Sequence, residues 1–416
     1  MIRISRAAAA AAVAAVATLA ACADDPEVVA PPTPAGGELF ASYVALGNSI
    51  TAGYQSGGIT DSTQRESYAR LLAGAMGTRY AYAQIANPGC PPPVENFQTQ
   101  SRGTGVTATT CALRNPASLN PVLNNVAVPN AYVIDPISRT TGNSNALTTL
   151  ILGGVSQAAK ALQANPTFVS VWLGNNDVLA AGVSGVITPL AGVSPGITPA
   201  ATFATTYAQV LDSLQLAPRL EGGVLLGVVN VTAAPVLFPA AAFASPAFKA
   251  GFDAFANTTT TVLPNCAGST SLISFQLAGQ IRTYVSTGGT SGHPPVISCA
   301  KGQFPASALV GELFVLDAAE QTAITAAVNA YNTAIQAEAT ALGWAYFDPN
   351  PVLAALKAPP STAITVVPNL ASATNTFGTH VSLDGVHPRR PAHVLVANGV
   401  IAAINTKYGT SLAPVQ

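Results

Sequence analysis

Short apolar runs and stretches with helical spacing alternate along the chain. Ser42 to Leu46 and Phe168 to Leu173 are continuous apolar runs, which are typical of parallel strands covered on both faces. Further strands are expected at 80–86, 223–231 and 344–347, and helices at 66–76, 147–162, 203–216, 321–342 and 391–404. This alternation predicts an α/β fold with a central parallel sheet and helices on both of its faces.

One long uncharged stretch, residues 222–244, has two interpretations. A hydropathy window favours a membrane helix, because the stretch carries no charged side chain. Asn230, Pro235 and Pro239 interrupt it, and its first part is rich in β-branched residues. We therefore expect a strand followed by a loop.

The first residues have the composition of a secretory signal. Arg3 and Arg6 precede an uncharged run of about 15 residues, Ala7 to Ala21, which is followed by Cys22 and is short for a membrane span. Leu19-Ala20-Ala21-Cys22 resembles the lipobox of bacterial lipoproteins, in which the cysteine is lipidated after cleavage. The alternative is an ordinary signal peptide with a cysteine there by chance. The expected location is thus lipid-anchored to a bacterial membrane, preferably the outer one because Ala23 rather than Asp follows.

Residues 23–38 are rich in Pro, Ala and Gly, a composition that predicts a flexible linker between this anchor and the body of the protein. An exported protein also favours disulfides. Apart from Cys22 the chain has four cysteines, which allow three pairings. Neighbours in sequence close the shortest loops, so we expect Cys90–Cys111 and Cys266–Cys299.

Composition narrows the class of partner. Charged residues make up 8% of the chain and hydrophobic residues 49%, and Lys+Arg 17 against Asp+Glu 18 gives a net charge of -1. This balance argues against a basic groove for nucleic acid. His293, His380 and His393 lack the paired spacing of metal ligands, so neither a metal nor another cofactor is expected.

Three separated stretches carry side chains suited to catalysis. Ser49 follows the first expected strand, and the polar run 174–177 follows another, so both lie at the sheet edge where α/β folds bind ligands. Asp384 stands three residues before His387, which allows a carboxylate to orient an imidazole that accepts a proton from a serine. Taken singly, each stretch has a plain alternative: a helix cap, a turn, or a surface Asp–His pair.

Together these stretches resemble the sequence blocks of the SGNH hydrolases, also called the GDSL lipase/esterase family. Two of the family's blocks are intact, as Gly174-Asn175-Asn176-Asp177 and Asp384-Gly385-Val386-His387. The first block reads Gly47-Asn48-Ser49, with Asn48 where the family usually has Asp, and a looser second block ends at Gly89. The resemblance spans about Phe40 to Tyr408 and predicts one hydrolase domain over residues 39–410, after a signal peptide at 1–22.

The resemblance implies a flavodoxin-like three-layer α/β/α fold and a role for each matching residue. Ser49 would be the nucleophile, His387 its general base, and Asp384 the residue that orients His387. The oxyanion hole would consist of the backbone N–H groups of Ser49 and Gly89 and the side-chain amide of Asn176. Long segments at 90–145, 178–202 and 232–318 exceed what a compact member of the family needs, and no role is assigned to them.

The predicted function is therefore a serine esterase that cleaves a small-molecule, lipid or glycan ester and is attached to a membrane through lipidated Cys22. The alternative is a non-catalytic surface lipoprotein that binds glycan or protein on the same fold. Residues 233–252 are apolar and follow an expected strand, so they either wall an acyl pocket or pack on the domain's own core. The side chains concerned are Val236, Leu237, Phe238, Phe243, Phe248 and Phe252.

Overall fold

The computed structural model describes residues 35, 37–103, 122–138, 146–189, 196–288, 295–301 and 313–416. Its centre is a parallel sheet with the strand order β1-β4-β7-β13. This confirms the predicted α/β class with a central parallel sheet. The strands are β1 (Tyr43–Gly47), β4 (Phe168–Trp172), β7 (Gly222–Leu226) and β13 (Ala345–Phe347).

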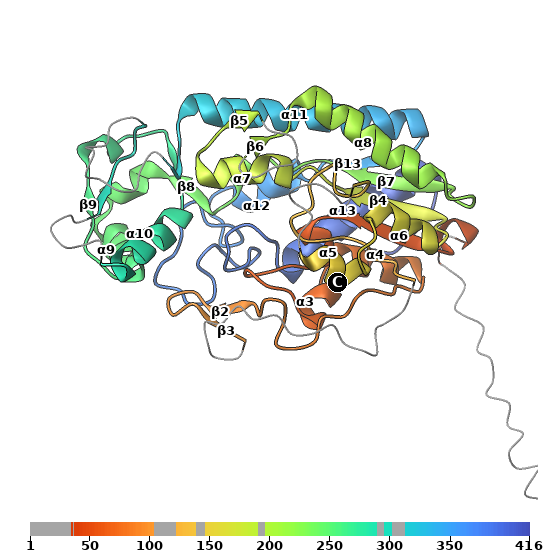
Figure 1. Ribbon diagram of the computed structural model, residues 1–416, viewed down its shortest axis with the longest axis horizontal. Helices are drawn as coiled ribbons and strands as arrows, with labels where there is room; N and C mark the ends of the chain where they lie inside the picture. The colour runs from red at the N-terminus through yellow and green to blue at the C-terminus, as the bar shows by residue number, and fades with distance from the viewer. Residues whose placement is uncertain are drawn as a thin grey trace, which may run out of the picture. The chain divides into compact units, whose positions relative to one another are not determined.

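Alternate side chains of each strand enter separate hydrophobic clusters on the two faces of the sheet. Val44 and Val171 belong to one cluster, and Tyr43 and Trp172 belong to the other. Helices cover both faces, so the fold has three layers (Figure 1). The first cluster is covered by α6 (Gln157–Gln163), α7 (Asn176–Ser184), α8 (Ala200–Gln215) and α11 (Ala318–Leu342), and the second by α4 (Tyr68–Met76) and α13 (Arg390–Tyr408).

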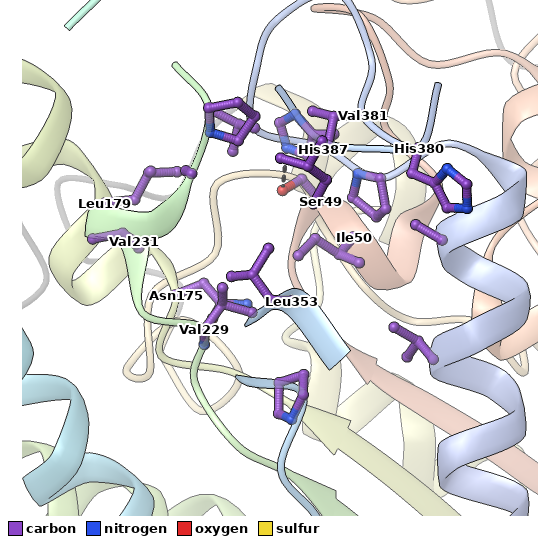
Figure 2. Close-up of a pocket in the computed structure, with 18 of the residues that line it drawn as sticks. Ser49, Ile50, Asn175, Leu179, Val229, Val231, Leu353, His380, Val381 and His387 are labelled. Atoms are coloured by element: carbon purple, nitrogen blue, oxygen red, sulfur yellow. Dashed lines mark hydrogen bonds between the residues drawn. The ribbon is translucent and has the colours of Figure 1, made fainter. Parts of the chain in front are cut away.

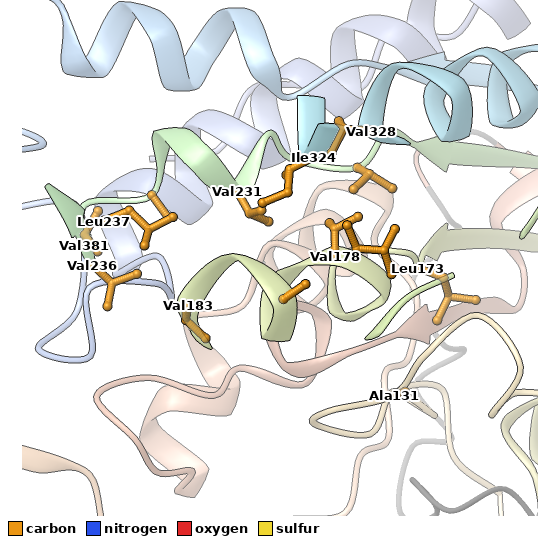
Figure 3. Close-up of a cluster of buried hydrophobic side chains, with 14 of the residues drawn as sticks. Ala131, Leu173, Val178, Val183, Val231, Val236, Leu237, Ile324, Val328 and Val381 are labelled. Atoms are coloured by element: carbon orange, nitrogen blue, oxygen red, sulfur yellow. The ribbon is translucent and has the colours of Figure 1, made fainter. Parts of the chain in front are cut away.

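The first cluster extends beyond the sheet toward its carboxyl edge. There Val178 and Val183 of α7 meet Ile324 and Val328 of α11, with Val231 between them (Figure 3). Because α7 begins directly after β4, this packing fixes the start of α7 against the sheet. It thereby holds the polar run 174–177 at the carboxyl edge.

Helix α11 shows how the local sequence sets the bounds of an element. The Asp317 carboxylate accepts a hydrogen bond from the N–H of Glu320, and the Glu320 side chain bonds back to the N–H of Asp317, which is a capping box. Gly343 ends the helix with φ 68°, a conformation that glycine adopts readily. The structure therefore begins this helix slightly before the predicted residue 321.

One expected strand is absent and one expected helix is divided, each for a visible reason. Residues 80–86 form no strand, because their backbone bonds to side chains: Ala81 N–H to Asn124 Oδ1 and Ile85 N–H to Gln64 Oε1. The place beside β1 is taken by residues 124–128, with Ala45 paired in parallel to Asn125. The helix expected at 147–162 is split into α5 (Ala146–Leu152) and α6 by a turn that contains glycines with positive φ at 153 and 154.

Strand β7 is also shorter than predicted. After Leu226 the N–H groups of Val228, Val229 and Asn230 donate to asparagine side chains, so the ladder ends and the chain turns away. The stretch 222–244 is thus not a single helix. The expected strand is present as β7, but the expected loop also contains a second short strand, Leu237–Pro239, and 3-10 turns at Val231–Ala233 and Ala240–Ala244. Among the helices of the described residues, none is both long and apolar enough to cross a membrane.

The insertion after β7 forms a small lobe of its own, on the left of Figure 1. It holds an antiparallel sheet in the order β12-β10-β8 and a parallel pair β9–β11. A disulfide joins Cys266 and Cys299, the pairing expected from the sequence. Its elements are β8 (Leu237–Pro239), η4 (Ala240–Ala244), α9 (Pro246–Ala256), β9 (Thr261–Val262), η5 (Pro264–Cys266), β10 (Leu272–Ser274), α10 (Gln276–Ser286), β11 (Val296–Ile297) and β12 (Val315–Leu316).

Cys90 is disulfide-bonded, and its expected partner Cys111 lies outside the described residues, as does Cys22.

The remaining elements are short. The short elements are η1 (Gly37–Phe40), α2 (Ser49–Ala52), α3 (Asp61–Arg65), β2 (Val94–Asn96), β3 (Ser101–Arg102), β5 (Thr188–Pro189), β6 (Gly196–Ile197), η3 (Val231–Ala233) and α12 (Asn350–Lys357).

Candidate active site

Ser49 is the first residue of α2, and a single residue, Asn48, separates it from the end of β1. Asn48 caps the helix, because its Oδ1 accepts a hydrogen bond from the N–H of Ile50 at 3.1 Å. A side chain on Gly47 would place its Cβ 2.9 Å from the carbonyl oxygen of Trp172, so only glycine fits there. Asn in place of the family's usual Asp at position 48 therefore still provides the oxygen that caps α2.

His387 and Asp384 lie on one tight loop that faces Ser49. The imidazole Nε2 lies 2.8 Å from Ser49 Oγ, and its Nδ1 lies 2.8 Å from Asp384 Oδ2. The hydrogen bond between Ser49 and His387 is drawn in Figure 2. Ser49 is thus joined in one hydrogen-bonded row to His387 and Asp384, which lie more than 300 residues later in the sequence.

Asp384 is held as a carboxylate by its surroundings. Its Oδ1 accepts hydrogen bonds from the N–H groups of Val386 and His387, and its Oδ2 accepts one from the N–H of Gly57. Burial alone would raise the pKa of Asp384, but the charge of His387 and the hydrogen bonds from His387 and Val386 outweigh burial and hold this pKa well below its usual range. Asp384 is therefore negatively charged at neutral pH.

The ring of Tyr54 lies against the imidazole of His387, with their centroids 5.0 Å apart. Burial, and to a lesser extent the charge of Asp384, raises the pKa of Tyr54 to about 12. The phenol is therefore neutral at neutral pH. Its ring restricts the positions that the imidazole can take.

Of the three residues expected in the oxyanion hole, two line the cavity beside Ser49 described below and one does not. Ser49 is the first residue of α2, so its N–H has no partner within the helix. The Asn176 amide donates to the carbonyl oxygen of Ala131 at 2.9 Å, which uses one of its two N–H bonds, and Asn176 lines the cavity beside Ser49. Gly89 has φ 126° and is not among the residues that line this cavity. The roles of all three stay predictions.

The last residue of the same block, Asp177, is fully buried under the site. Its carboxylate accepts hydrogen bonds from Thr198 Oγ1 at 2.6 Å and from the N–H of Val133 at 3.0 Å. Burial nevertheless raises the pKa of Asp177 to about 7. Asp177 connects the loop around 131–133 to the start of α7, and so supports the position of Asn176.

Beside Ser49 lies a cavity of about 110 Å³ with a mostly apolar wall. Ser49 and His387 lie at one end of it and Val229 at the other, with Leu353 between them (Figure 2). Among the polar residues of the wall, Asn175 lies at the far end, where its Oδ1 accepts a hydrogen bond from the N–H of Val229. The apolar wall is formed by Ile50, Leu179, Val229, Val231, Val352, Leu353, Leu356, Ile364, Val381, Val386 and Val396.

This wall corrects one of the two interpretations of residues 233–252. Only Ala234 and Pro235 of that segment line the cavity. The phenylalanines instead pack on one another and on Phe275 in the lobe, so the core interpretation holds. Helix α12 was not predicted, although its apolar residues at 352, 353 and 356 follow the last strand with helical spacing.

A buried serine hydrogen-bonded to an imidazole that is itself hydrogen-bonded to a carboxylate, at the carboxyl edge of a parallel α/β sheet, is characteristic of α/β serine hydrolases. The particular family follows from the whole sequence. The chain belongs to the GDSL-like Lipase/Acylhydrolase family, whose sequence profile matches residues 43–400. The predicted family and the predicted class of enzyme, a carboxylic ester hydrolase, are confirmed.

Several solved structures have a related backbone. An alpha/beta hydrolase from the metagenome of Lake Arreo, Spain, is 13% identical, with 89% of this chain and 98% of that chain covered and a TM-score of 0.38. A catalytic mutant of an acetylxylan esterase from Geobacillus stearothermophilus is 11% identical, with 90% of this chain and 96% of that chain covered and a TM-score of 0.37. An extracellular lipase from Streptomyces rimosus is 15% identical, with 88% of this chain and 98% of that chain covered and a TM-score of 0.36. These likenesses are weak, and no curated protein matches the sequence.

Within the described residues, no group of three His, Cys, Asp or Glu side chains is placed to hold a metal ion. His380 lines the cavity, whereas His393 is buried and accepts a hydrogen bond from the N–H of Tyr68. Burial lowers the pKa of His393 to about 3, so this histidine is neutral. His293 lies outside the described residues.

Proposed function

We propose that the chain hydrolyses carboxylic esters through an acyl-enzyme on Ser49. The observation that carries this proposal is the unbroken row from Ser49 Oγ through His387 to Asp384, with both hydrogen bonds at 2.8 Å. A serine hydroxyl is a weak nucleophile until a base accepts its proton. In this row the base is already in place, and Asp384 fixes the tautomer in which Nε2 can accept that proton.

The reaction has two balanced steps. Ser49 Oγ attacks the ester carbonyl and its proton passes to His387 Nε2; the imidazolium then protonates the leaving alcohol as the ester C–O bond breaks. In the second step a water attacks the acyl-enzyme, loses its proton to His387, and releases the carboxylic acid as Ser49 regains its proton. Asp384 remains ionised throughout and stabilises the imidazolium.

The negative charge that forms on the carbonyl oxygen needs donors placed before the reaction. We assign these to the backbone N–H of Ser49, the backbone N–H of Gly89 and the second N–H of the Asn176 amide. Loss of one such donor typically costs about 3 kcal/mol of transition-state stabilisation. Asn176→Ala is therefore expected to lower kcat by a factor of order one hundred.

The cavity supports an acyl group longer than acetyl. One water needs about 10–15 Å³ of such a cavity. A cavity of about 110 Å³ can therefore hold an acyl group several atoms larger than acetyl. Each buried methylene contributes up to about 0.8 kcal/mol. The value of kcat/KM should therefore rise from acetyl esters toward esters with medium-length acyl chains.

The test is hydrolysis of an aryl ester series, from acetyl to decanoyl, by the purified chain. Wild type should hydrolyse it and Ser49→Ala should not, while Ser213→Ala, which changes a half-buried serine of α8, serves as the matched control. Turnover by Ser49→Ala at the wild-type rate would overturn the mechanism. A profile that peaks at acetyl and falls steeply would overturn the assignment of the cavity.

We further propose that the enzyme is exported and anchored to the outer membrane through lipidated Cys22, with residues 1–22 as signal peptide, 23–38 as linker and 39–410 as the hydrolase domain. What supports this is the sequence around Cys22. Firm anchoring needs more than one acyl chain, which lipoprotein processing provides. Cys22→Ser should prevent processing, so that the signal peptide stays attached to the chain. A processed, membrane-bound Cys22→Ser protein would contradict the proposal.

A further inference from the structure

Two serines outside the catalytic row connect the loop that carries Asp384 to the loop that follows Ser49. The N–H of Ser56 donates to Ser382 Oγ at 2.9 Å. In return, Ser56 Oγ accepts a hydrogen bond from the N–H of Leu383 at 3.1 Å. Ser382 is fully buried and Ser56 nearly so. We call this reciprocal pair, Ser56 and Ser382, the serine clamp.

The clamp continues directly into the catalytic carboxylate. Ser382 Oγ donates its hydrogen to Asp384 Oδ1 at 2.9 Å. The residue after Ser56, Gly57, donates its N–H to the other oxygen, Oδ2, at 2.9 Å. Both oxygens of Asp384 are therefore bonded to the clamp or to its immediate neighbour.

The backbone of Ser56 gives an independent reason to regard it as more than a turn residue. Residues 55–58 form a tight turn in which Gln55 and Gly58 exchange backbone hydrogen bonds. Ser56 has φ 52° and Gly57 has φ 68°, and Gly, Asn or Asp is the usual choice at the first of these positions. A serine held in this sparsely populated conformation points to a requirement for its hydroxyl.

We propose that Ser56 and Ser382 are positioning residues, which hold Asp384 at the distance and angle that His387 requires. This inference rests on the proposed function of Ser49, His387 and Asp384. The clamp joins segments that are more than 300 residues apart in sequence. It couples the carboxylate to the turn after the nucleophile helix, so that Ser49 and Asp384 keep a fixed separation.

The proposal predicts a specific pattern for Ser382→Ala. A hydrogen bond to a charged group is typically worth a factor of about ten to one hundred, so kcat should fall by that factor while KM for a short ester stays nearly constant. The Ser382 O–H points its positive end at Asp384. Without it the carboxylate stabilises protonated His387 more strongly, so the acid limb of the kcat/KM profile should move to higher pH.

A second variant separates positioning from folding. Ser56→Gly suits the turn conformation, removes the side chain with its hydroxyl, and leaves the hydrogen bonds from Ser382 Oγ and from Gly57 N–H to Asp384 in place. It should lower kcat about tenfold, by less than Ser382→Ala. The other charged or titratable groups near Asp384, which are Arg389, Tyr54 and His387, are unchanged in both variants.

The experiment measures kcat, KM and pH profiles per active site, after titration of active sites, for wild type, Ser382→Ala, Ser56→Gly and Ser170→Ala. Ser170 is the matched control, a buried serine of β4 bonded to Tyr43 at 2.7 Å, whose loss should lower stability and leave the pH profile unchanged. The proposal is overturned if both clamp variants keep the wild-type kcat and pH profile. It is also overturned if Ser170→Ala loses as much kcat as the clamp variants do and the clamp variants show no shift of the pH profile. Ser49→Ala in the same series tests the proposed function separately, because that variant must be inactive whatever the clamp does.

Discussion

Replacement of Asp384 by asparagine is the most informative change to the catalytic row, because it keeps the shape of the side chain and removes its charge. In the wild-type site each carboxylate oxygen only accepts hydrogen bonds: Oδ1 from Ser382, Val386 and His387 N–H, and Oδ2 from Gly57 N–H and His387 Nδ1. An amide has one oxygen and one NH2 group. Whichever way it is turned, its NH2 group faces at least one N–H donor.

The less costly orientation leaves the amide oxygen at the Oδ1 position, with its three donors. The NH2 group then faces Gly57 N–H and His387 Nδ1. Nδ1 can accept from this group only in the tautomer that carries its proton on Nε2, and such an imidazole cannot accept the proton of Ser49. In the Ser-His-Asp template this exchange costs a factor of about 10⁴ in kcat, and we expect a loss of the same order here.

The same change leaves the N–H of Gly57 without an acceptor, which should cost about 1–3 kcal/mol of stability. The assay is kcat on an aryl ester at neutral pH, together with urea denaturation of the same preparation. Asp212→Asn, on the exposed side of α8, is the control that changes net charge equally. A kcat for Asp384→Asn within tenfold of wild type would refute the orienting role of Asp384.

Three further outcomes follow from the structure. Because burial raises the pKa of Asp177 to about 7 from its usual value near 3.8, the folded chain binds this proton more tightly than the unfolded chain. The contribution of Asp177 to the free energy of unfolding should therefore fall by up to about 4 kcal/mol as pH rises from about 4 to about 7. Urea denaturation should find this dependence missing in Asp177→Asn. Leu353→Ala lengthens the cavity, so the optimum of the ester series should move to longer acyl chains; an unmoved optimum would show that α12 does not limit the chain. Asp317→Ala removes the cap of α11 and should cost about 1 kcal/mol in urea denaturation without changing kcat; no loss of stability would contradict the capping role.

Elements with strong local signals could be predicted from the sequence. Strands β1 and β4 are continuous apolar runs that end in polar turns, and α11 has a capping box at one end and a glycine at the other. The inferences on these elements depend only on residues within a few positions of one another. The resemblance of the catalytic stretches to the family's sequence blocks also brought Ser49, Asp384 and His387 together, because each block is a short local motif.

The failures share a different cause, which is dependence on distant side chains. Residues 80–86 have the composition of a strand, but Asn124 and Gln64 take their backbone hydrogen bonds. The cavity beside Ser49 depends on which side of α12 faces it, and an apolar helix face alone does not indicate a cavity. The serine clamp is likewise two ordinary serines in the sequence, brought together only by the fold.

The central claim is that Ser49 carries the acyl group, and covalent labelling tests it most directly. Wild type should react with a fluorophosphonate to give one adduct per chain, located on Ser49 by peptide mass analysis, and the enzyme should lose its esterase activity in step with labelling. Ser49→Ala should take up no label, and His387→Ala should react far more slowly because the hydroxyl has lost its base. Full inactivation with the label on any other residue, or a Ser49→Ala protein that is labelled as wild type is, would contradict the account.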